Sequence, residues 1–207
     1  MAPRKRQHER KAETRAELLD AAARSFARDG YQGASLDQVA ESAGFTTGAI
    51  YRHFTSKEDL FLSLFEDRIE KRILQIAETI RPELSPEDQV AQAAKQFAEL
   101  SGRDPDWYLL LFEYWLQAAR NPALRGRFEK VHRGAQASVA SLCEETAIAL
   151  GRPLRMPPDQ LAVALIAVSY GFALERILGS DLVSDELITR VLSGIALEGG
   201  LGDQGSQ

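Results

Sequence analysis

The chain has 207 residues, of which 44% are hydrophobic and 27% charged, a composition that argues against a disordered or fibrous protein. Its net charge of −5 is unevenly divided, because residues 1–57 hold 10 Lys/Arg against 7 Asp/Glu and residues 58–207 hold 15 against 23. A basic head on an acidic body suits a protein that docks one end on a polyanion.

The start of the chain is basic and lacks an apolar core segment, so we expect no signal peptide. Residues 1–7 predict a disordered arm, which either stays solvated or contacts DNA. A first helix is predicted over residues 10–28, because Leu18, Ala22 and Phe26 recur at helical spacing. Gly30 follows as the residue expected to end it.

Residues 35–54 predict two short helices joined by a tight turn. Ser35 and Gln38 form the pattern of a capping box at the start of the first helix. Gly44 lets the chain turn sharply where a side chain would collide. In the second helix Ile50 and Phe54 face inward, which leaves small and hydrogen-bonding residues outside. A helix-turn-helix unit needs this division, because its second helix enters the major groove of DNA.

This stretch resembles the DNA-binding domain of the TetR-type transcriptional regulators. The resemblance runs from Lys11 to Lys71 and includes the Ala-Gly turn, the segment Gly48–Phe54 and the segment Ser56–Leu60. It implies a DNA-binding domain over residues 11–71 and a ligand-binding and dimerisation domain over residues 72–207. Beyond residue 71 the chain matches the family only in its helical layout.

The resemblance implies which residues meet DNA. Ser35, Tyr51, His53 and Lys57 are expected to hold phosphates, and phosphate contacts fix the register of the protein on the duplex. The candidates for approaching or contacting bases are Thr46, Thr47, Gly48 and Arg52. Arg52 fits either a guanine or a phosphate. The second helix has few long polar side chains, which leaves the base preference open.

A long fourth helix is predicted from residue 56 to about residue 80, so it joins the head to the body. Proline at the first helical position marks further helices at about 86–101, 105–120, 122–150 and 158–178, and a last helix covers about 185–198. No strand pattern occurs, so the predicted fold is all-α with about nine helices. The apolar run Leu161–Leu174 is too short to span a bilayer, and we expect a cytoplasmic protein without a membrane partner.

The helix at 158–178 has a side of small residues, Ala164, Ala167 and Gly171, beside a side of larger apolar ones. One side can serve the core of this subunit and the other a second subunit. The family resemblance likewise implies a homodimer through the helices at 158–178 and 185–198. The alternative is a core that lies entirely within one chain.

The helix at 105–120 is apolar on every side, so it is expected to be enclosed by other helices. Apolar cavities between helices usually hold small ligands. The candidate ligand-binding residues are Trp107, Tyr108, Phe112, Trp115, His132 and Tyr170. Glu113 and Arg176 are candidate polar contacts. Ordinary core packing is the alternative for each of these residues.

No catalytic motif is present in the sequence. Glu129 and His132 have the Glu-x-x-His spacing of a di-iron site but lack the second pair that such a site needs, and Cys143 has no histidine near it in sequence. We therefore expect no metal, no cofactor and no enzymatic activity.

The sequence thus favours a homodimeric repressor that binds a pseudo-palindromic double-stranded DNA operator and is released by a small, largely apolar ligand. An activator or an effector-independent DNA binder are alternatives within the same class. A helical adaptor that binds only proteins is the alternative from a different class.

Overall fold

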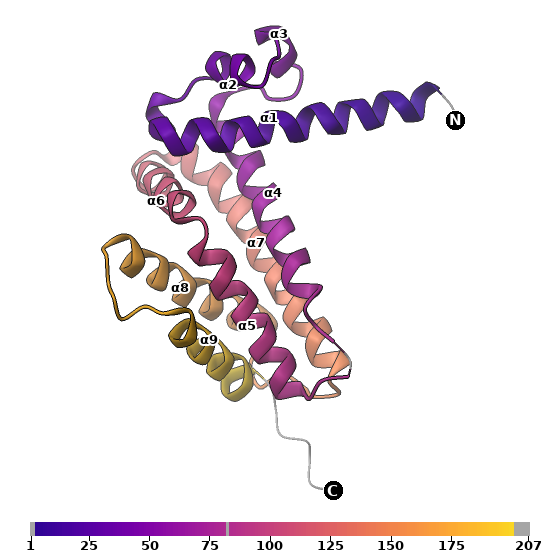
Figure 1. The fold of residues 1–207 in the computed structure, drawn as a ribbon, viewed down its shortest axis with the longest axis vertical. Coiled ribbons are helices and arrows are strands. Elements are labelled where there is room, and N and C mark those ends of the chain that lie inside the picture. Colours follow the sequence, from indigo (N-terminus) through magenta and orange to yellow (C-terminus); the bar gives the residue numbers. More distant parts are fainter. Residues whose placement is uncertain (1–2, 82, 201–207) are drawn as a thin grey trace, which may run out of the picture. The chain divides into compact units, whose positions relative to one another are not determined.

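The computed structural model describes residues 3–81 and 83–200, with side chains placed within residues 9–197 (Figure 1). Every regular element in these ranges is helical, which confirms the all-α prediction and the nine predicted helices. The helices are α1 (Pro3–Gly33), α2 (Leu36–Ser42), α3 (Thr47–Ile50), α4 (Lys57–Ala77), α5 (Pro86–Gly102), α6 (Pro105–Arg120), α7 (Pro122–Ala149), α8 (Pro158–Ile177) and α9 (Asp185–Gly194), followed by a π-helical segment, Ile195–Gly200.

The helix ends follow from capping residues that the sequence displays. Ser85 accepts the backbone N–H of Asp88 at 3.1 Å, and Asp104 accepts that of Trp107 at 3.3 Å. Side-chain caps of this kind satisfy the N–H groups that the first turn of a helix leaves without partners. The observed ends of α5, α6, α7 and α8 lie within one residue of the prediction, although α8 begins after Pro157 without a side-chain cap.

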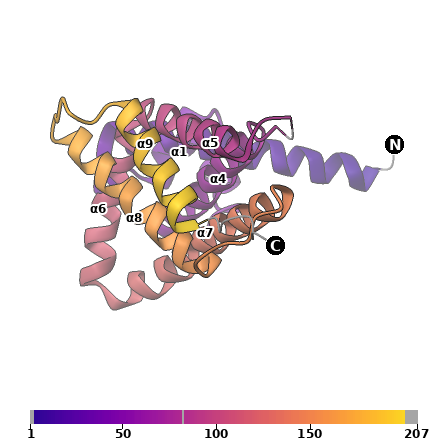
Figure 2. The same ribbon diagram turned by 90° about the horizontal axis from the view of Figure 1, so that it is seen from below.

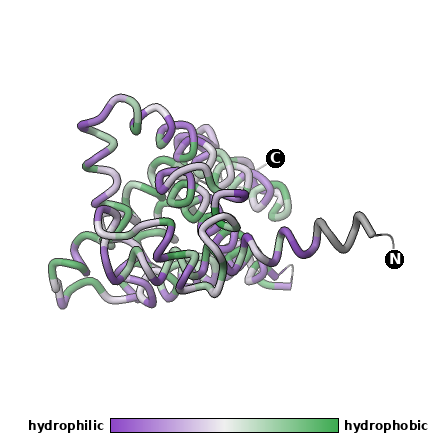
Figure 3. The backbone as a smooth tube through the Cα atoms, turned by 90° about the horizontal axis from the view of Figure 1, so that it is seen from above, coloured by the Kyte–Doolittle hydropathy of each residue, from purple (hydrophilic) through white to green (hydrophobic). Residues whose placement is uncertain are grey.

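The start of α1 differs from the prediction. Residues 3–7 belong to the helix, so the predicted disordered arm is wrong for them, while residues 1–2 lie outside the described part of the chain. The cause is the composition of this stretch: Pro3 suits the first helical turn, and the Arg, Lys, Gln and Glu residues that follow have high helix propensity. The outer part of α1 that carries colour in Figure 3 is mostly hydrophilic, as a solvated helix requires. Near its other end α1 breaks at Gly30 (φ 69°), where the sequence predicts the helix to stop.

The chain divides into two compact units. Unit 1 comprises residues 1–67 and 110–128, and unit 2 comprises residues 68–109 and 129–207. The sequence predicts a boundary after residue 71 and does not foresee that residues 110–128, from α6 and α7, join the unit that contains the helix-turn-helix. Three helices, α4, α6 and α7, contribute residues to both units.

The core of unit 1 is aromatic. The ring of Phe61 stacks on that of Tyr114 with centroids 4.1 Å apart, and the rings of Phe26 and Tyr31 meet Phe61 edge-on at 5.9 and 5.5 Å. Offset and edge-on pairs of this kind add specific geometry to the burial of apolar area. Because Tyr114 is fully buried among residues of α1 and α4, it fixes this part of α6 within the unit.

The core of unit 2 forms where α5 packs against α9 and α9 lies beside α8 (Figures 1 and 2). Ala94 and Ala98 of α5 meet Ile188 and Leu192 of α9, and the small alanines allow the two helices to approach closely. Partly buried residues of α8, including Leu165 and Phe172, pack against the same cluster. One face of α8 is therefore committed to the core of the chain.

The opposite face of α8 is apolar and exposed. Val163 is 48% exposed, Leu174 46% and Leu178 73%, and Ala167 and Gly171 lie exposed between them. Among the described helices α8 alone is long and apolar enough to cross a bilayer, but helices of soluble proteins meet the same condition. A single chain thus leaves an apolar stripe along α8 without a cover.

Candidate nucleic-acid interface

The turn between α2 and α3 has the geometry that the sequence predicts. Ser35 and Gln38 form the complete capping box at the start of α2. Gly44 adopts φ 75°, a left-handed conformation that favours glycine, and the N–H of Phe45 donates to the carbonyl of Ala40 at 2.8 Å. The chain therefore reverses between two helices within a few residues, as a helix-turn-helix requires.

The second helix presents a hydrophilic outer surface. Ile50 and Phe54 are buried, whereas Tyr51 is 51% exposed. The other exposed candidates on this surface are Thr46, Thr47, Gly48 and Arg52. The regular helix α3 is only four residues long, but backbone hydrogen bonds from His53 and Phe54 to Ile50 continue the turns. Thr46 also caps this helix, since its hydroxyl oxygen accepts the N–H of Ala49 at 3.2 Å. The predicted division into an inner and an outer side is thus present.

His53 lies at the edge of this surface and is half-buried. Burial lowers the pKa of its imidazole, and the positive charges of Lys11, Arg15 and Arg52 lower that pKa further. The lowered pKa favours the neutral form of the ring. Its Nδ1 atom is buried and has no hydrogen-bond partner among the described residues. A neutral imidazole can still donate one N–H to a phosphate.

Lys57 and Ser35 already have partners within unit 1. The Lys57 ammonium donates to the carbonyl oxygen of Gln32 at 3.0 Å and lies 4.9 Å from the centre of the Tyr31 ring. Burial lowers the pKa of this ammonium, and the carboxylate of Glu113 partly opposes that effect. The Ser35 hydroxyl is shared with Gln38. Lys57 has further N–H groups for a phosphate, so these contacts are compatible with the predicted role.

Glu113 has a part in the structure that the sequence does not indicate. Its carboxylate accepts the backbone N–H of Tyr31 at 3.0 Å and that of Gln32 at 3.4 Å, just after the break at Gly30. Gly30 has φ 69°, which favours glycine, and a Cβ added there would lie 3.1 Å from one carboxylate oxygen of Glu113, so that carboxylate would have to shift. α6 is thereby tied to the segment that leads into α2. Only the isolation of one acidic residue in an apolar helix hints at this contact.

The six candidate ligand-binding residues divide between the two units. Phe112 and Trp115 belong to unit 1, where their rings stack with centroids 6.3 Å apart. In unit 2 the rings of His132 and Tyr170 lie 6.2 Å apart. Trp107 and Tyr108 are also in unit 2 and are 4% and 3% exposed. The prediction that the helix around these residues is enclosed on every side is wrong for the single chain.

The exposed side of α6 shows this directly. Leu109 is 56% exposed, Leu116 62% and Trp115 38%, because the other helices of the chain cover only the opposite side. Arg176, the second candidate polar contact, donates to the carboxylate of Asp185 at 2.5 Å and to the carbonyl of Val183 at 3.4 Å. It therefore anchors the connection between α8 and α9.

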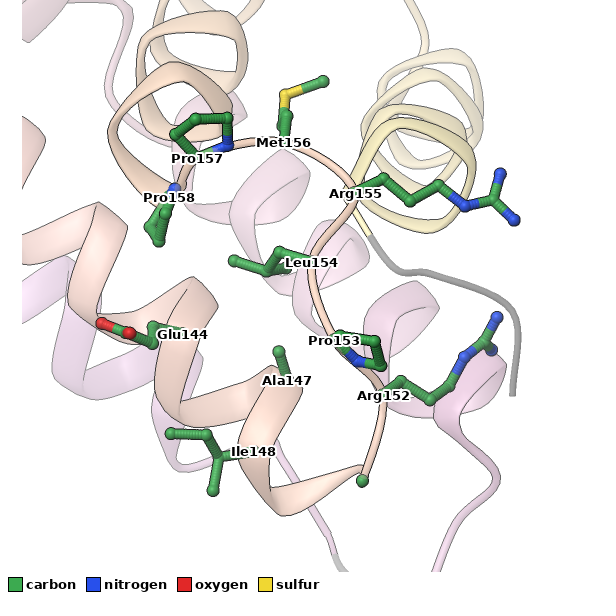
Figure 4. A pocket seen from close by; sticks show the side chains of 11 residues that line it. Glu144, Ala147, Ile148, Arg152, Pro153, Leu154, Arg155, Met156, Pro157 and Pro158 are labelled. Carbon is green, nitrogen blue, oxygen red and sulfur yellow. The ribbon is translucent and has the colours of Figure 1, made fainter. Parts of the chain in front are cut away.

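A surface pocket of about 590 Å³ lies at the connection between α7 and α8 (Figure 4). Its lining comprises Glu144, Ala147, Ile148 and residues 151–158. Ala147 and Leu154 lie toward its middle, whereas the guanidinium groups of Arg152 and Arg155 point away from them in Figure 4. None of the six candidate ligand-binding residues lines this pocket.

Metal and thiol chemistry find little support in the described residues. No group of three or more His, Cys, Asp or Glu side chains placed to hold a metal ion occurs among them. Cys143 is half-buried, and burial raises the pKa of its thiol to about 11. Such a thiol is protonated at neutral pH and is a poor nucleophile.

Two family models match the chain. Residues 18–64 match the model described as bacterial regulatory proteins of the tetR family, which runs from the second half of α1 into the first part of α4. Residues 86–197 match the model of the C-terminal part of BetI-type transcriptional repressors, which begins at α5 and extends past α9.

Curated relatives include both repressors and activators. The transcriptional repressor AcnR of Corynebacterium diphtheriae is 30% identical over 168 residues, which are 81% of this chain and 83% of the relative. The transcriptional activator FasR of Mycolicibacterium smegmatis is 29% identical over 101 residues, which are 49% of this chain but only 46% of the relative. The match to the fatty acid metabolism regulator of Bacillus subtilis likewise spans only 45% of that protein.

Solved structures share the fold over nearly their whole length. A TetR-family regulator from Rhodococcus has a TM-score of 0.72 at 22% identity and covers 88% of this chain and 96% of its own. FadR from Bacillus subtilis, in complex with stearoyl-CoA, has a TM-score of 0.63 at 20% identity, covering 86% and 97%. A regulator from Saccharomonospora viridis in complex with choline has a TM-score of 0.62 at 19% identity, covering 92% and 99%.

Proposed function

The chain belongs to the TetR family of transcriptional regulators, and from this membership we propose that it is a homodimeric repressor that leaves its operator when it binds a small ligand. The family consists of DNA-binding regulators rather than enzymes. The observation that carries the proposal is the outer surface of α3, where small and hydrogen-bonding side chains stand exposed above a buried apolar side. A cytoplasmic location belongs to the same proposal, because the operator DNA is there.

The roles on DNA follow from the exposure of each residue. Gly48 lies at the start of α3, and a Cβ added there would meet only the Thr46 hydroxyl oxygen, at 4.0 Å, so the backbone can approach the groove. Arg52 projects from the same surface and is the candidate for a bidentate contact to guanine. Tyr51, His53 and Lys57 are the candidates for phosphate contacts. The basic charge of residues 1–57 supports this placement.

The exposed stripe of α8 supports the dimer. Leaving Val163, Leu174 and Leu178 exposed to water is unfavourable, because the burial of apolar surface contributes a free energy of roughly 25 cal/mol per Å². A second copy that presents the same stripe would cover these side chains in a two-fold interface. Ala167 and Gly171 would allow the two helices to approach closely. A dimer also gives two heads for the two halves of a pseudo-palindromic operator.

Release from DNA by a ligand needs a structural element that responds to the ligand and extends into the unit that contains the helix-turn-helix. α4 begins in unit 1 at Lys57 and ends in unit 2 at Ala77, so a ligand bound in unit 2 can act on the far end of the same helix. The ligand weakens DNA binding only if it prefers the form that does not fit the operator. Stearoyl-CoA and choline in the complexes of the two structural neighbours are examples of small molecules bound by proteins of this fold.

An activator is the second candidate, because the relative FasR is named as one. A gel-shift experiment with the chain's own upstream region tests the shared claim of DNA binding, and a transcription assay then separates the two outcomes. We expect specific binding that the change Gly48→Ala weakens at least tenfold, because a methyl group at the groove separates the surfaces.

The control for this change is Gly126→Ala, which adds the same methyl group at an exposed position of α7 with nothing within 4 Å. It should leave DNA binding unchanged. Equal binding by wild type and Gly48→Ala would place the contact surface elsewhere. Absence of any DNA binding would favour a helical adaptor.

A further inference from the structure

Arg72 of α4 projects into the interior of unit 2. Its Nη1 atom donates to the hydroxyl of Tyr108 at 2.6 Å, and its Nη2 atom donates to the carbonyl of Leu100 at 3.5 Å. The guanidinium carbon lies 5.7 Å from the centre of the Phe97 ring and 5.5 Å from that of Tyr108. The charge is thus enclosed by aromatic rings from α5 and α6.

No carboxylate of the described residues forms an ion pair with this guanidinium. Several other arginines form ion pairs in the part of the chain that the structure describes, and none of these pairs includes Arg72. Arg68, one turn earlier on α4, has both kinds of partner: it pairs with the carboxylate of Asp104 and lies 4.7 Å from the Trp107 ring. A half-buried cation without a counter-charge is costly, so Arg72 has the character of a site that awaits an anion.

Further hydrogen-bonding groups gather at the same place. The hydroxyls of Tyr108 and Ser101 are 3.1 Å apart. Tyr170 of α8 is close enough for its pKa, which burial raises, to respond to both Tyr108 and Arg72. Tyr170, Phe97 and Arg72 itself each keep part of their surface accessible. The group combines one cation, neutral hydroxyls and apolar rings.

We propose that Arg72, with the hydroxyls of Tyr108 and Tyr170, binds the anionic group of the effector, which is therefore an apolar small molecule that carries a carboxylate or a phosphate. This inference rests on the proposed function for its regulatory meaning, although the binding itself does not. Guanidinium groups bind both anions in a two-pronged geometry. The same charge repels a cation, so the site selects against a ligand such as choline.

The first test needs no ligand and compares the thermal unfolding of Arg72→Met with that of Arg68→Met. Because methionine keeps apolar volume and removes an uncompensated charge, Arg72→Met should match or exceed the wild-type melting temperature. Arg68→Met leaves Asp104 without its partner and should melt several degrees lower. An equal loss in both variants would make Arg72 a structural residue and overturn the proposal.

The second test measures binding to the full-length protein by thermal shift and calorimetry. The probes are dodecanoate below its micellar concentration, 4-phenylbutanoate and stearoyl-CoA. Dodecanamide and 4-phenylbutanamide serve as neutral counterparts, and choline serves as the cation. We expect at least one anion to bind the wild type. Its neutral counterpart should bind the wild type at least tenfold more weakly, and Arg72→Met should bind the anion at least tenfold more weakly. Arg72→Lys keeps the positive charge but lacks the two-pronged guanidinium group, so its affinity for the anion should lie between those of the wild type and Arg72→Met. Arg68→Met should bind the anion as the wild type does.

Binding of choline, equal binding of an acid and its amide, or failure of all three anions would overturn the proposal. Binding of stearoyl-CoA alone would assign the site to phosphate, and binding of the free acids would assign it to carboxylate. These measurements contain no DNA. Binding of the anions without binding of an operator would therefore support this inference and contradict the proposed function. Binding of an operator without binding of the anions would support the proposed function and contradict this inference.

Discussion

The contact of Glu113 with the segment after Gly30 offers a quantitative test of how unit 1 is held together. The change Glu113→Gln keeps the size of the side chain and removes its charge. The amide can accept the N–H of Tyr31 through its oxygen, but its NH₂ group then faces the N–H of Gln32, donor against donor.

The magnitude follows from the two hydrogen bonds. A hydrogen bond to a charged group contributes about 1.5–3 kcal/mol. The bond to Tyr31 at 3.0 Å is partly buried, whereas the bond to Gln32 at 3.4 Å is exposed and adds little. Because glutamine retains part of the stronger bond, we expect the free energy of unfolding to fall by about 1–2 kcal/mol. For a protein of this size that corresponds to a decrease in melting temperature of roughly 2–8 °C.

Thermal and urea unfolding of both proteins measure this difference. The control is Glu99→Gln, because Glu99 is 34% exposed and its carboxylate pairs with Arg103, one turn away at the end of the same helix, at 3.4 Å. Exposed pairs of this kind contribute little, so the control should melt within about 1 °C of the wild type. If Glu113→Gln has the same melting temperature as the control, the carboxylate does not stabilise the contact between α6 and the segment after Gly30, and the reasoning is refuted.

Three further changes test the DNA-binding surface and the dimer. Lys57→Ala should weaken binding to operator and to random DNA about equally and lower the salt slope by about one unit; an unchanged slope with a lower melting temperature would leave Lys57 only its contacts within unit 1. Arg52→Ala should cost roughly 1–3 kcal/mol on the operator and far less on random DNA, whereas equal losses would assign Arg52 to phosphate. A Cβ added at Gly171 meets nothing within 4 Å in its own chain, so Gly171→Leu should overpack the interface with the partner and shift the protein toward monomer in light scattering. Gly134→Leu, on α7 with equally open surroundings, is the matched control, and an intact dimer in both variants would move the interface away from α8.

Local signals in the sequence account for most of the fold. Ser35 with Gln38, Ser85 before Pro86 and the glycine at position 44 each act through neighbours a few residues away, so their roles can be predicted without knowledge of distant contacts. The inner and outer sides of α3 follow from spacing alone. The exposed stripe of α8 does not follow in the same way, because it combines Ala167 and Gly171 from the predicted side of small residues with Val163 and Leu174 from the side of larger ones.

Contacts between distant residues are beyond such reasoning. Glu113 and Tyr31 are 82 positions apart, and the Lys57 ammonium meets a carbonyl 25 positions away. Nothing in the sequence distinguishes Arg72 from Arg68, because the difference between them is the carboxylate of Asp104, which reaches only one. At residues 3–7 the interpretation of a local signal is wrong. Their charges suggest a disordered arm, but their helix propensity extends α1.

A hydroxyl-radical footprint of the protein on its own upstream DNA is the sharpest test of operator binding by a dimer. Two heads that read successive major grooves should protect two patches on one face of the duplex, with centres about 34–36 Å apart or a multiple of that turn. At a protein concentration that just protects the DNA with the wild type, Arg52→Ala should weaken both patches together, because the two copies use the same surface. A single patch, protection without this periodicity, or a footprint that Arg52→Ala and Gly48→Ala leave unchanged would contradict a dimer that binds through α3.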